Sequence, residues 1–185
     1  VILASTLWPM TKIGNEFMPP LDEGDLMYMP STYPGISIGK ARELLQQTDK
    51  LIRTVPEVAT VFGKVGRAET ATDPAPLTMI ETFIQFKDRS EWRDGVTPES
   101  LKQELASLVQ LPGLTNAWVM PIRTRIDMLA TGIKTPVGIK VAGADLDVIQ
   151  RIGQQLENSL AGVPGTSSVY SERVAAGRYI KVDID

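Results

Sequence analysis

The chain has 185 residues, of which 43% are hydrophobic and 22% are charged, so it is long enough for one or two small globular domains with their own cores. Its net charge is -3, with both signs interspersed along the sequence, and this argues against nucleic-acid binding because no basic stripe is available to neutralise phosphates. The sequence contains no cysteine and no histidine, which excludes disulfides, thiolate ligands and imidazole ligands or bases.

The N-terminal segment is apolar until Lys12. This run is roughly half the length of a membrane span, and Trp8 and Lys12 are residue types that favour the membrane interface. The basic region that opens a secretory signal is missing. We therefore expect residues 1–23 to be the end of a transmembrane helix and a connector within a longer protein. A buried first strand or a short amphipathic turn is the alternative.

A proline-containing turn occurs three times, at Pro56, Pro112 and Pro164, at intervals of about fifty residues. Each turn follows a helical pattern and precedes a β-rich run. The three helices are predicted to begin after Ser37, at Thr97-Pro98 and near Asp145, where capping residues stand. Their expected apolar stripes are Ala41, Leu44, Leu45, Leu51, Ile52 and Val55; Leu101, Leu105, Leu108 and Val109; and Leu146, Ile149, Ile152, Leu156 and Leu160.

Strands are expected around these helices, at about residues 25–31, 58–65, 78–86, 115–120, 135–142 and 167–172, with a further one at 177–184. The order of elements predicts an α+β fold: a ferredoxin-like β-α-β-β-α-β unit followed by one half, β-α-β, of a second unit. The other half of the second unit has to come from elsewhere, because half a unit leaves a sheet edge and a helix face uncovered.

Three methionines stand in settings that are unusual for core residues: Met29 in Tyr-Met-Pro, Met79 two residues before Glu81, and Met128 in Arg-Ile-Asp-Met-Leu. Without cysteine and histidine, thioethers are the soft donors of this chain, and soft sulfur selects Cu(I) and similar monovalent ions. Strands one and three of a ferredoxin-like sheet are neighbours, so Met29 and Met79 are expected close together, with Met79 on the same face as Glu81. Methionine also fills irregular gaps in cores, and this alternative stays open for each of the three.

Three segments closely resemble the copper/silver-exporting heavy-metal efflux pumps of the resistance-nodulation-division superfamily, and the resemblance runs over essentially the whole chain. They are EGDLMYMPST at residues 23–32, FGK and AETATD within residues 62–73, and PIRTRIDMLATGIK at residues 121–134. The three methionines separate the monovalent-metal branch of this family from the zinc/cobalt branch, which lacks them.

The resemblance implies a non-enzymatic part of a proton-driven pump of the bacterial inner membrane, a homotrimer that works with a periplasmic adaptor protein and an outer-membrane channel. This chain would open the second periplasmic loop, with a first porter subdomain at 24–113, half of the next at 114–166 and the start of the docking domain at 167–185. Met29, Met79 and Met128 would bind Cu(I) or Ag(I) as the transported ion, with no organic cofactor. The residues expected around that cleft are Glu23, Asp73, Glu81, Arg125 and Lys134.

Neutral thioethers suit transport, because they need no deprotonation and their modest donor strength lets an ion leave as well as arrive. A site divided between two subdomains requires a connector that flexes, for which Gly132 and residues 123–134 are the candidates. An enzyme is disfavoured, because the chain has no histidine base, no cysteine nucleophile and no Gly-rich phosphate loop. The alternative is a structural interaction module that contacts neighbouring subunits and an adaptor protein without binding metal.

Overall fold

A computed structural model describes residues 22–66, 76–133, 135, 137–166 and 169–172, together with residues 5, 8, 9 and 12. The expected membrane-helix end at residues 1–23 falls almost entirely outside these residues. Within the described part of the chain, no helix has the length and apolarity needed to cross a membrane. The elements in chain order are β1 (Asp25–Tyr28), α2 (Ile38–Ile52), β2 (Val58–Val65), β3 (Ile80–Phe86), the 3-10 turn η1 (Arg89–Glu91), α3 (Pro98–Leu108), β4 (Trp118–Val119), α4 (Pro121–Thr131) and α5 (Leu146–Leu160).

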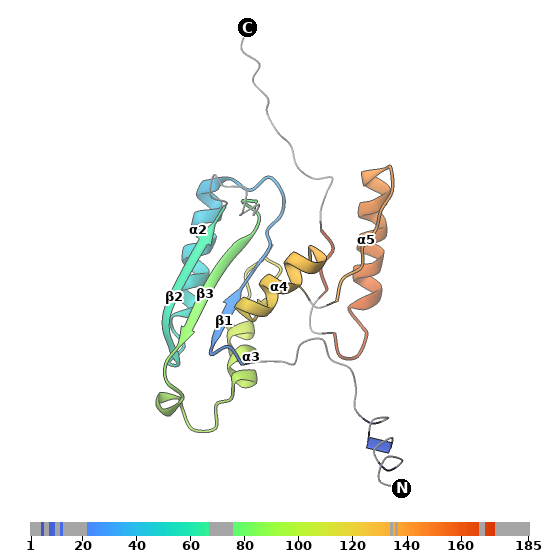
Figure 1. Cartoon of the computed structure of the whole chain (residues 1–185). Helices are drawn as coiled ribbons and strands as arrows, with labels where there is room; N and C mark the ends of the chain where they lie inside the picture. Colours follow the sequence, from blue (N-terminus) through green and yellow to red (C-terminus); the bar gives the residue numbers. More distant parts are fainter. Residues whose placement is uncertain are drawn as a thin grey trace.

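The four strands form one antiparallel sheet in the order β2-β3-β1-β4 (Figure 1). This order and the succession β-α-β-β-α-β are those predicted for the first unit, with β2 and β4 at the two edges. Beyond the strand ends the pairing continues, because Ser31 bridges both Met79 and Thr115. Strand pairing therefore extends past the C-terminal end of β1 to Ser31. The candidate site lies at this end of the sheet.

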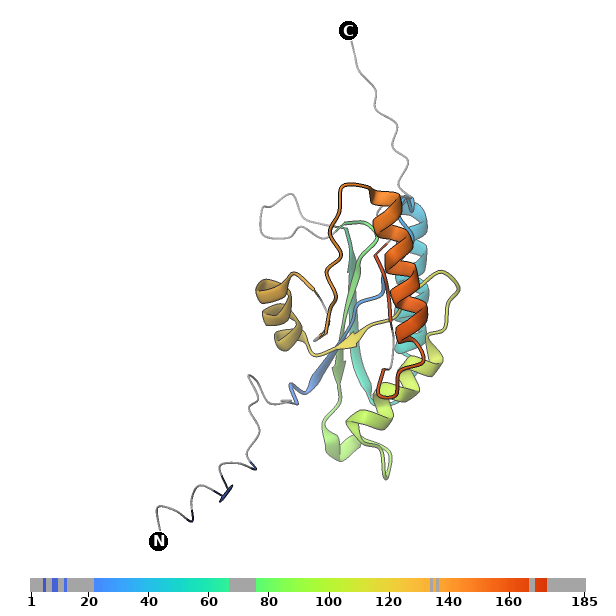
Figure 2. The ribbon, with the colours of Figure 1, turned by 90° about the vertical axis from the view of Figure 1, so that its right-hand side faces the viewer.

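Helices α2 and α3 cover one face of the sheet (Figure 2). Both begin as predicted: Ser37 accepts a hydrogen bond from the Lys40 amide at 3.2 Å, and Thr97 forms a capping box with Ser100. The core between helices and sheet consists of Leu26, Tyr28, Ile52, Val55, Val58, Ile84, Leu101, Leu105 and Val109. The prediction that Leu108 belongs to this core is wrong, since its side chain is 36% exposed at the end of α3.

An ion pair between a buried carboxylate and a half-exposed arginine joins the turn before β2 to the segment before α3. The Glu57 side chain is fully buried, and its carboxylate accepts hydrogen bonds from Arg93 Nε at 2.6 Å and Arg93 Nη2 at 2.9 Å. Arg93 also pairs with Glu104 on α3 at 2.7 Å. The hydrogen bond from Arg93 lowers the pKa of Glu57, outweighing the opposing effect of burial.

Residues 121–131 form helix α4, where the sequence analysis expected a flexible connector. Pro121 occupies the first turn, and Gly132 ends the helix in the left-handed conformation with φ 73°. The helix lies on the face of the sheet opposite α2, next to β1 (Figure 2). The site is therefore built from a sheet and a third helix, not from a sheet and a loop.

The second unit is only partly formed. Helix α5 begins at Asp145, whose carboxylate accepts hydrogen bonds from the amides of Asp147 and Val148, as predicted. No strand forms at the described residues of 135–142 and 167–172, and residues 177–184 lie outside the described part. The expected burial of the α5 stripe is also wrong, because Leu146 is 56% and Ile152 is 37% exposed. Both differences have one cause: strands and helix faces need partners, and the described residues offer none here.

Candidate metal-ion site

Strand pairing brings two of the three methionines to one face of the sheet. Tyr28 pairs with Thr82 and Ser31 pairs with Met79, so the same register sets Met29 opposite Glu81. Directly opposed residues point to the same face, and the face alternates along each strand. Tyr28 and Leu26 pack into the helical core, so Met29, Met79 and Glu81 share the opposite face, which α4 partly covers. This confirms the predicted side of the sheet for Met79 relative to Glu81.

Helix α4 closes over this face and carries the third methionine. Thr124 is 3% exposed on α4, and Met128 follows it by four residues, so both lie on one side of the helix. Met29 is fully buried, whereas Met79 and Met128 are partly buried. The arrangement has two thioether-bearing residues on the sheet and one on the helix packed against it.

Glu81 is a buried carboxylate beside these residues. It is 5% exposed, and it pairs across the sheet with Lys64 of β2, whose Nζ lies 3.1 Å from Oε2. Oε2 is buried and accepts no well-aligned hydrogen bond within the described residues. The Lys64 ammonium is thus close enough to form an ion pair with Glu81, but its geometry is not that of a hydrogen bond. A row of side chains consequently runs across one face of the sheet, from Lys64 to Glu81 to Met29.

Sequence reasoning missed Lys64 as a residue of this site. It stands in a strand whose polar and apolar residues alternate poorly, and a single lysine there is normally a solvated surface residue. Only the register of β2 against β3 places it next to Glu81. The signal that would have found it is the pairing of residues 58–65 with residues 80–86 in the predicted sheet.

Glu23 has a defined role at the N-terminus of α4. Its two carboxylate oxygens accept hydrogen bonds from the Ile122 amide at 2.6 Å and the Arg123 amide at 2.9 Å. The residue at the start of α4, Met120, forms no side-chain cap. A carboxylate from the segment before β1 therefore satisfies the first turn of α4 and interacts favourably with its positive end. Glu23 ties the helix that carries Met128 to the strand that carries Met29.

The other three residues predicted for the cleft are Arg125, Asp73 and Lys134. Arg125 is exposed on α4, one residue after Thr124. Asp73 and Lys134 lie outside the described residues. In the described part of the chain, no three side chains among histidine, cysteine, aspartate and glutamate gather closely enough to hold a metal ion. The candidate ligands for an ion are accordingly the thioether sulfurs of the three methionines.

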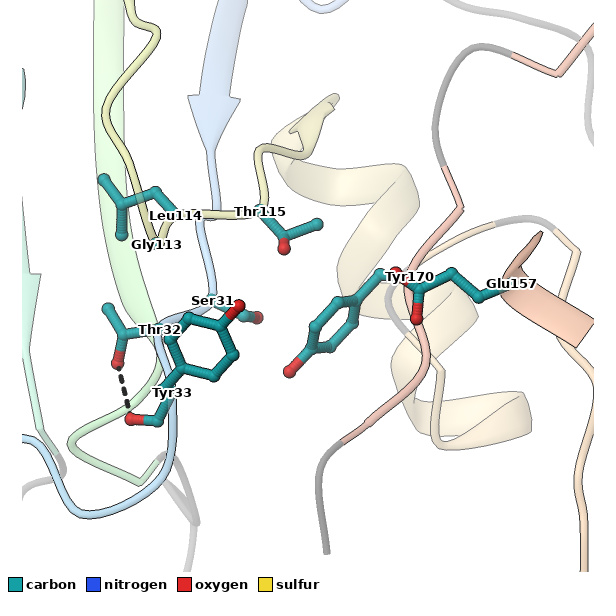
Figure 3. Close-up of a pocket in the computed structure, with 8 residues that line it drawn as sticks. All are labelled: Ser31, Thr32, Tyr33, Gly113, Leu114, Thr115, Glu157 and Tyr170. Atoms are coloured by element: carbon teal, nitrogen blue, oxygen red, sulfur yellow. Dashed lines mark hydrogen bonds between the residues drawn. The ribbon is translucent and has the colours of Figure 1, made fainter. Parts of the chain in front are cut away.

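A polar hollow of about 130 Å³ opens beside this region, where β1 ends (Figure 3). Tyr170 reaches from the C-terminal segment towards Ser31 and Tyr33, and the Thr32 hydroxyl donates to the Tyr33 carbonyl at 3.3 Å. The lining residues are Ser31, Thr32, Tyr33, Gly113, Leu114, Thr115, Glu157 and Tyr170. The hollow offers oxygen atoms and no sulfur, so its chemistry differs from that of the methionine region.

Comparisons with known proteins agree with this architecture. The model of the AcrB/AcrD/AcrF family matches residues 1–185. The chain is 56% identical over 181 residues to the cation efflux system protein CusA of Escherichia coli (strain K12) and to the putative cation efflux system protein SilA of Salmonella typhimurium. Each match covers 98% of this chain and 17% of the relative. The X-ray structure of a heavy metal efflux pump, crystal form II, superimposes with a TM-score of 0.78 at 28% identity, over 88% of this chain and 17% of that one. The chain thus spans 17% of the length of these relatives.

Proposed function

Because this chain belongs to the AcrB/AcrD/AcrF family of resistance-nodulation-division transporters, we propose that it is part of the periplasmic porter region of a Cu(I)/Ag(I) efflux pump. Met29, Met79 and Met128 bind the transported ion through their thioethers. The expectation of a transporter piece in place of an enzyme is confirmed at the level of the family.

One observation supports the assignment: strand register puts Met29 and Met79 on one face of the sheet, and α4, the helix that carries Met128, contacts β1. Met29 follows the last residue of β1 and Met79 precedes the first residue of β3, diagonally across the same pair of chain segments. Met128 lies in α4, and partial burial of its side chain agrees with a position towards the sheet. Thioethers favour soft monovalent ions over zinc, magnesium and calcium, and they bind without losing a proton. The names of the CusA and SilA relatives, both cation efflux systems, agree with a cation as cargo.

The division of the site between sheet and helix suits a transport cycle. Met29 belongs to the strand that also carries the core residues Leu26 and Tyr28, so this half of the site is rigid. Met128 belongs to α4, which rests on the sheet and is tied to it by Glu23. Displacement of α4 separates Met128 from the other two thioethers and lowers the affinity without any chemical change in the ion.

The larger assembly follows from the same assignment. In the full pump this region belongs to a homotrimer of the inner membrane, contacts an adaptor protein and feeds an outer-membrane channel. Residues 24–113 form its first porter subdomain, 114–166 contribute half of the second, and 167–185 begin the docking domain. The exposed apolar face of α5 agrees with a second subdomain completed by chain outside these residues.

The test compares two substitutions at proposed ligands, Met29→Ile and Met128→Ile, with one control substitution in the full pump. Met29→Ile removes a thioether and conserves volume, so it costs less than about 1.5 kcal/mol of folding free energy. We expect it to abolish Ag(I) binding in a titration and silver tolerance in cells, as Met128→Ile also does. The matched control is Met27→Ile, because Met27 is 3% exposed on the same face of β1, two residues away. The control retains binding and tolerance.

The same experiment decides the alternative. If Met29→Ile and Met128→Ile leave Ag(I) binding intact, the methionines are packing residues and the region is a structural module that contacts neighbouring subunits. If Met27→Ile is as damaging as Met29→Ile, the loss reflects packing of β1, and the ligand assignment fails.

A further inference from the structure

We propose that the ammonium group of Lys64 is the resident counter-cation of Glu81, and that a monovalent metal ion entering the methionine site displaces it. This inference rests on the proposed function and adds to it a mechanism of charge exchange. Lys64 is not a ligand in this scheme; it is the group with which the ion competes.

The register of the sheet provides the geometry. Lys64 pairs with Glu81 between β2 and β3, and the β1/β3 register sets Met29 opposite Glu81 on the other side. Glu81 is therefore flanked by an ammonium group on one side and a thioether on the other. The ammonium nitrogen is 3.1 Å from Oε2, a buried oxygen that accepts no well-aligned hydrogen bond from the residues the structure describes.

Electrostatics require a counter-charge at Glu81. A carboxylate that is 5% exposed pays a large desolvation cost unless a cation neutralises it. Lys64 fulfils this role while no ion is bound. Three neutral thioethers leave the full charge on an arriving ion, and two cations beside one carboxylate repel each other. One of the two must withdraw.

Lys64 is the group that can withdraw. It stands on the edge strand β2, near the end of the strand at Val65, and its side chain is 36% exposed against 6% for Glu81. A lysine side chain is long and flexible, and its ammonium group is readily solvated at the surface. Withdrawal of one positive charge as another enters leaves the net charge of the site unchanged. A divalent ion would leave one uncompensated charge, so the exchange favours monovalent cargo. The returning ammonium also assists release.

The first test measures competition in the full pump by Ag(I) titration. Lys64→Gln removes the competing charge, and we expect Ag(I) to bind about threefold to tenfold more tightly and dissociate more slowly. Lys64→Arg keeps the charge and stays close to the parent. In a Glu81→Gln background, Lys64→Gln has no effect, because the carboxylate that both cations share is gone. The matched control is Lys40→Gln, whose ion pair with Glu43 lies exposed on α2.

The second test uses the unsubstituted pump and does not depend on folding of a variant. Lysines are acetylated with a water-soluble reagent with and without Ag(I), and labelling is followed by peptide mass spectrometry. Ag(I) should raise the labelling rate of Lys64 and leave that of Lys40 unchanged. Unchanged labelling of Lys64, or Ag(I) affinity that is unchanged or weaker in Lys64→Gln, overturns the exchange. Equal tightening in the Glu81→Gln background overturns it as well.

These outcomes are separable from failure of the proposed function. If the parent pump binds no Ag(I), or Met29→Ile binds it normally, the methionine site itself is wrong. If the parent binds Ag(I), Met29→Ile does not, and Lys64 responds in neither test, the methionine site stands and only the exchange fails.

Discussion

Removal of the Glu23 carboxylate should loosen α4 without loosening the sheet. Glu23 accepts the amide hydrogen bonds of Ile122 and Arg123, and α4 has neither a side-chain cap at Met120 nor an acidic residue in its first turn. Loss of a helix cap together with its favourable interaction with the helix dipole costs about 1 to 2 kcal/mol. We therefore expect Glu23→Ala to raise the population of the opened first turn of α4 by a factor of roughly 5 to 30.

Amide hydrogen exchange in the full pump measures this directly. Exchange at Ile122 and Arg123 should accelerate by that factor, while the amides of β1 and β3 stay protected because strand pairing and the hydrophobic core hold the sheet. Glu23→Gln keeps a neutral acceptor, so its exchange rates at Ile122 and Arg123 should fall between those of the parent and those of Glu23→Ala. Glu43→Ala, which removes an exposed carboxylate from α2, is the control. Unchanged exchange at Ile122, or acceleration spread evenly over the sheet, would show that Glu23 does not anchor α4.

Two further predictions concern the stability of the first unit. Glu57→Gln should lower the free energy of unfolding by about 2 kcal/mol at pH 7, since it weakens charge-assisted hydrogen bonds from Arg93. The pKa of Glu57 is lowered in the folded protein, so this contribution is present above the unfolded pKa of about 4.3 and is lost as the pH falls through the folded value. Urea denaturation should show the gap between parent and variant shrinking towards pH 3, and a constant gap would contradict the ion-pair account. Gly63→Ala should cost about 1 to 3 kcal/mol in thermal denaturation, because a Cβ there would lie 2.8 Å from Asp49 Oδ2, whereas Gly39→Ala, with open space around it, should be neutral or stabilising. Equal melting temperatures for the two alanine variants would refute the packing argument.

The first unit could be predicted because its signals are local. Ser37 and Thr97 mark helix starts by their own side chains, and β2 is observed over the residues 58–65 expected from the pattern. Helices α2, α3 and α5 each end four residues before their proline, at Ile52, Leu108 and Leu160. The internal repeat of the sequence therefore appears as a regular spacing in the structure. A proline disfavours helical conformation at the residue before it, but these helices end earlier than that residue.

The unpredicted features depend on residues that are distant in the sequence. Helix α4 has a mixed, strongly charged sequence with no cap of its own, and the carboxylate that caps it belongs to Glu23, 99 residues before Ile122. Lys64 acquires its role from strand register alone. The described residues of 135–142 and 167–172 show the converse, since a sequence pattern that favours a strand forms none without a neighbouring strand to pair with.

The alternation of side chains along β1 lets one strand contribute to the core and also to the proposed ion site. Leu26 and Tyr28 point into the helical core, and Met27 and Met29 point to the other face, so every residue that fixes the strand is adjacent to one that faces α4. In the proposed ion site, the sheet half therefore shares the rigidity of the core, and packing limits the thermal motion of Met29. Helix α4 has no comparable core: none of its residues belongs to the main cluster, and its first turn is held by two hydrogen bonds that its amides donate to Glu23. The proposed site has one fixed half and one movable half. Repeated binding and release of the ion then requires that the net charge at the fixed half stay constant. In the exchange proposed above, Lys64, on the edge strand beside Glu81, keeps that charge constant.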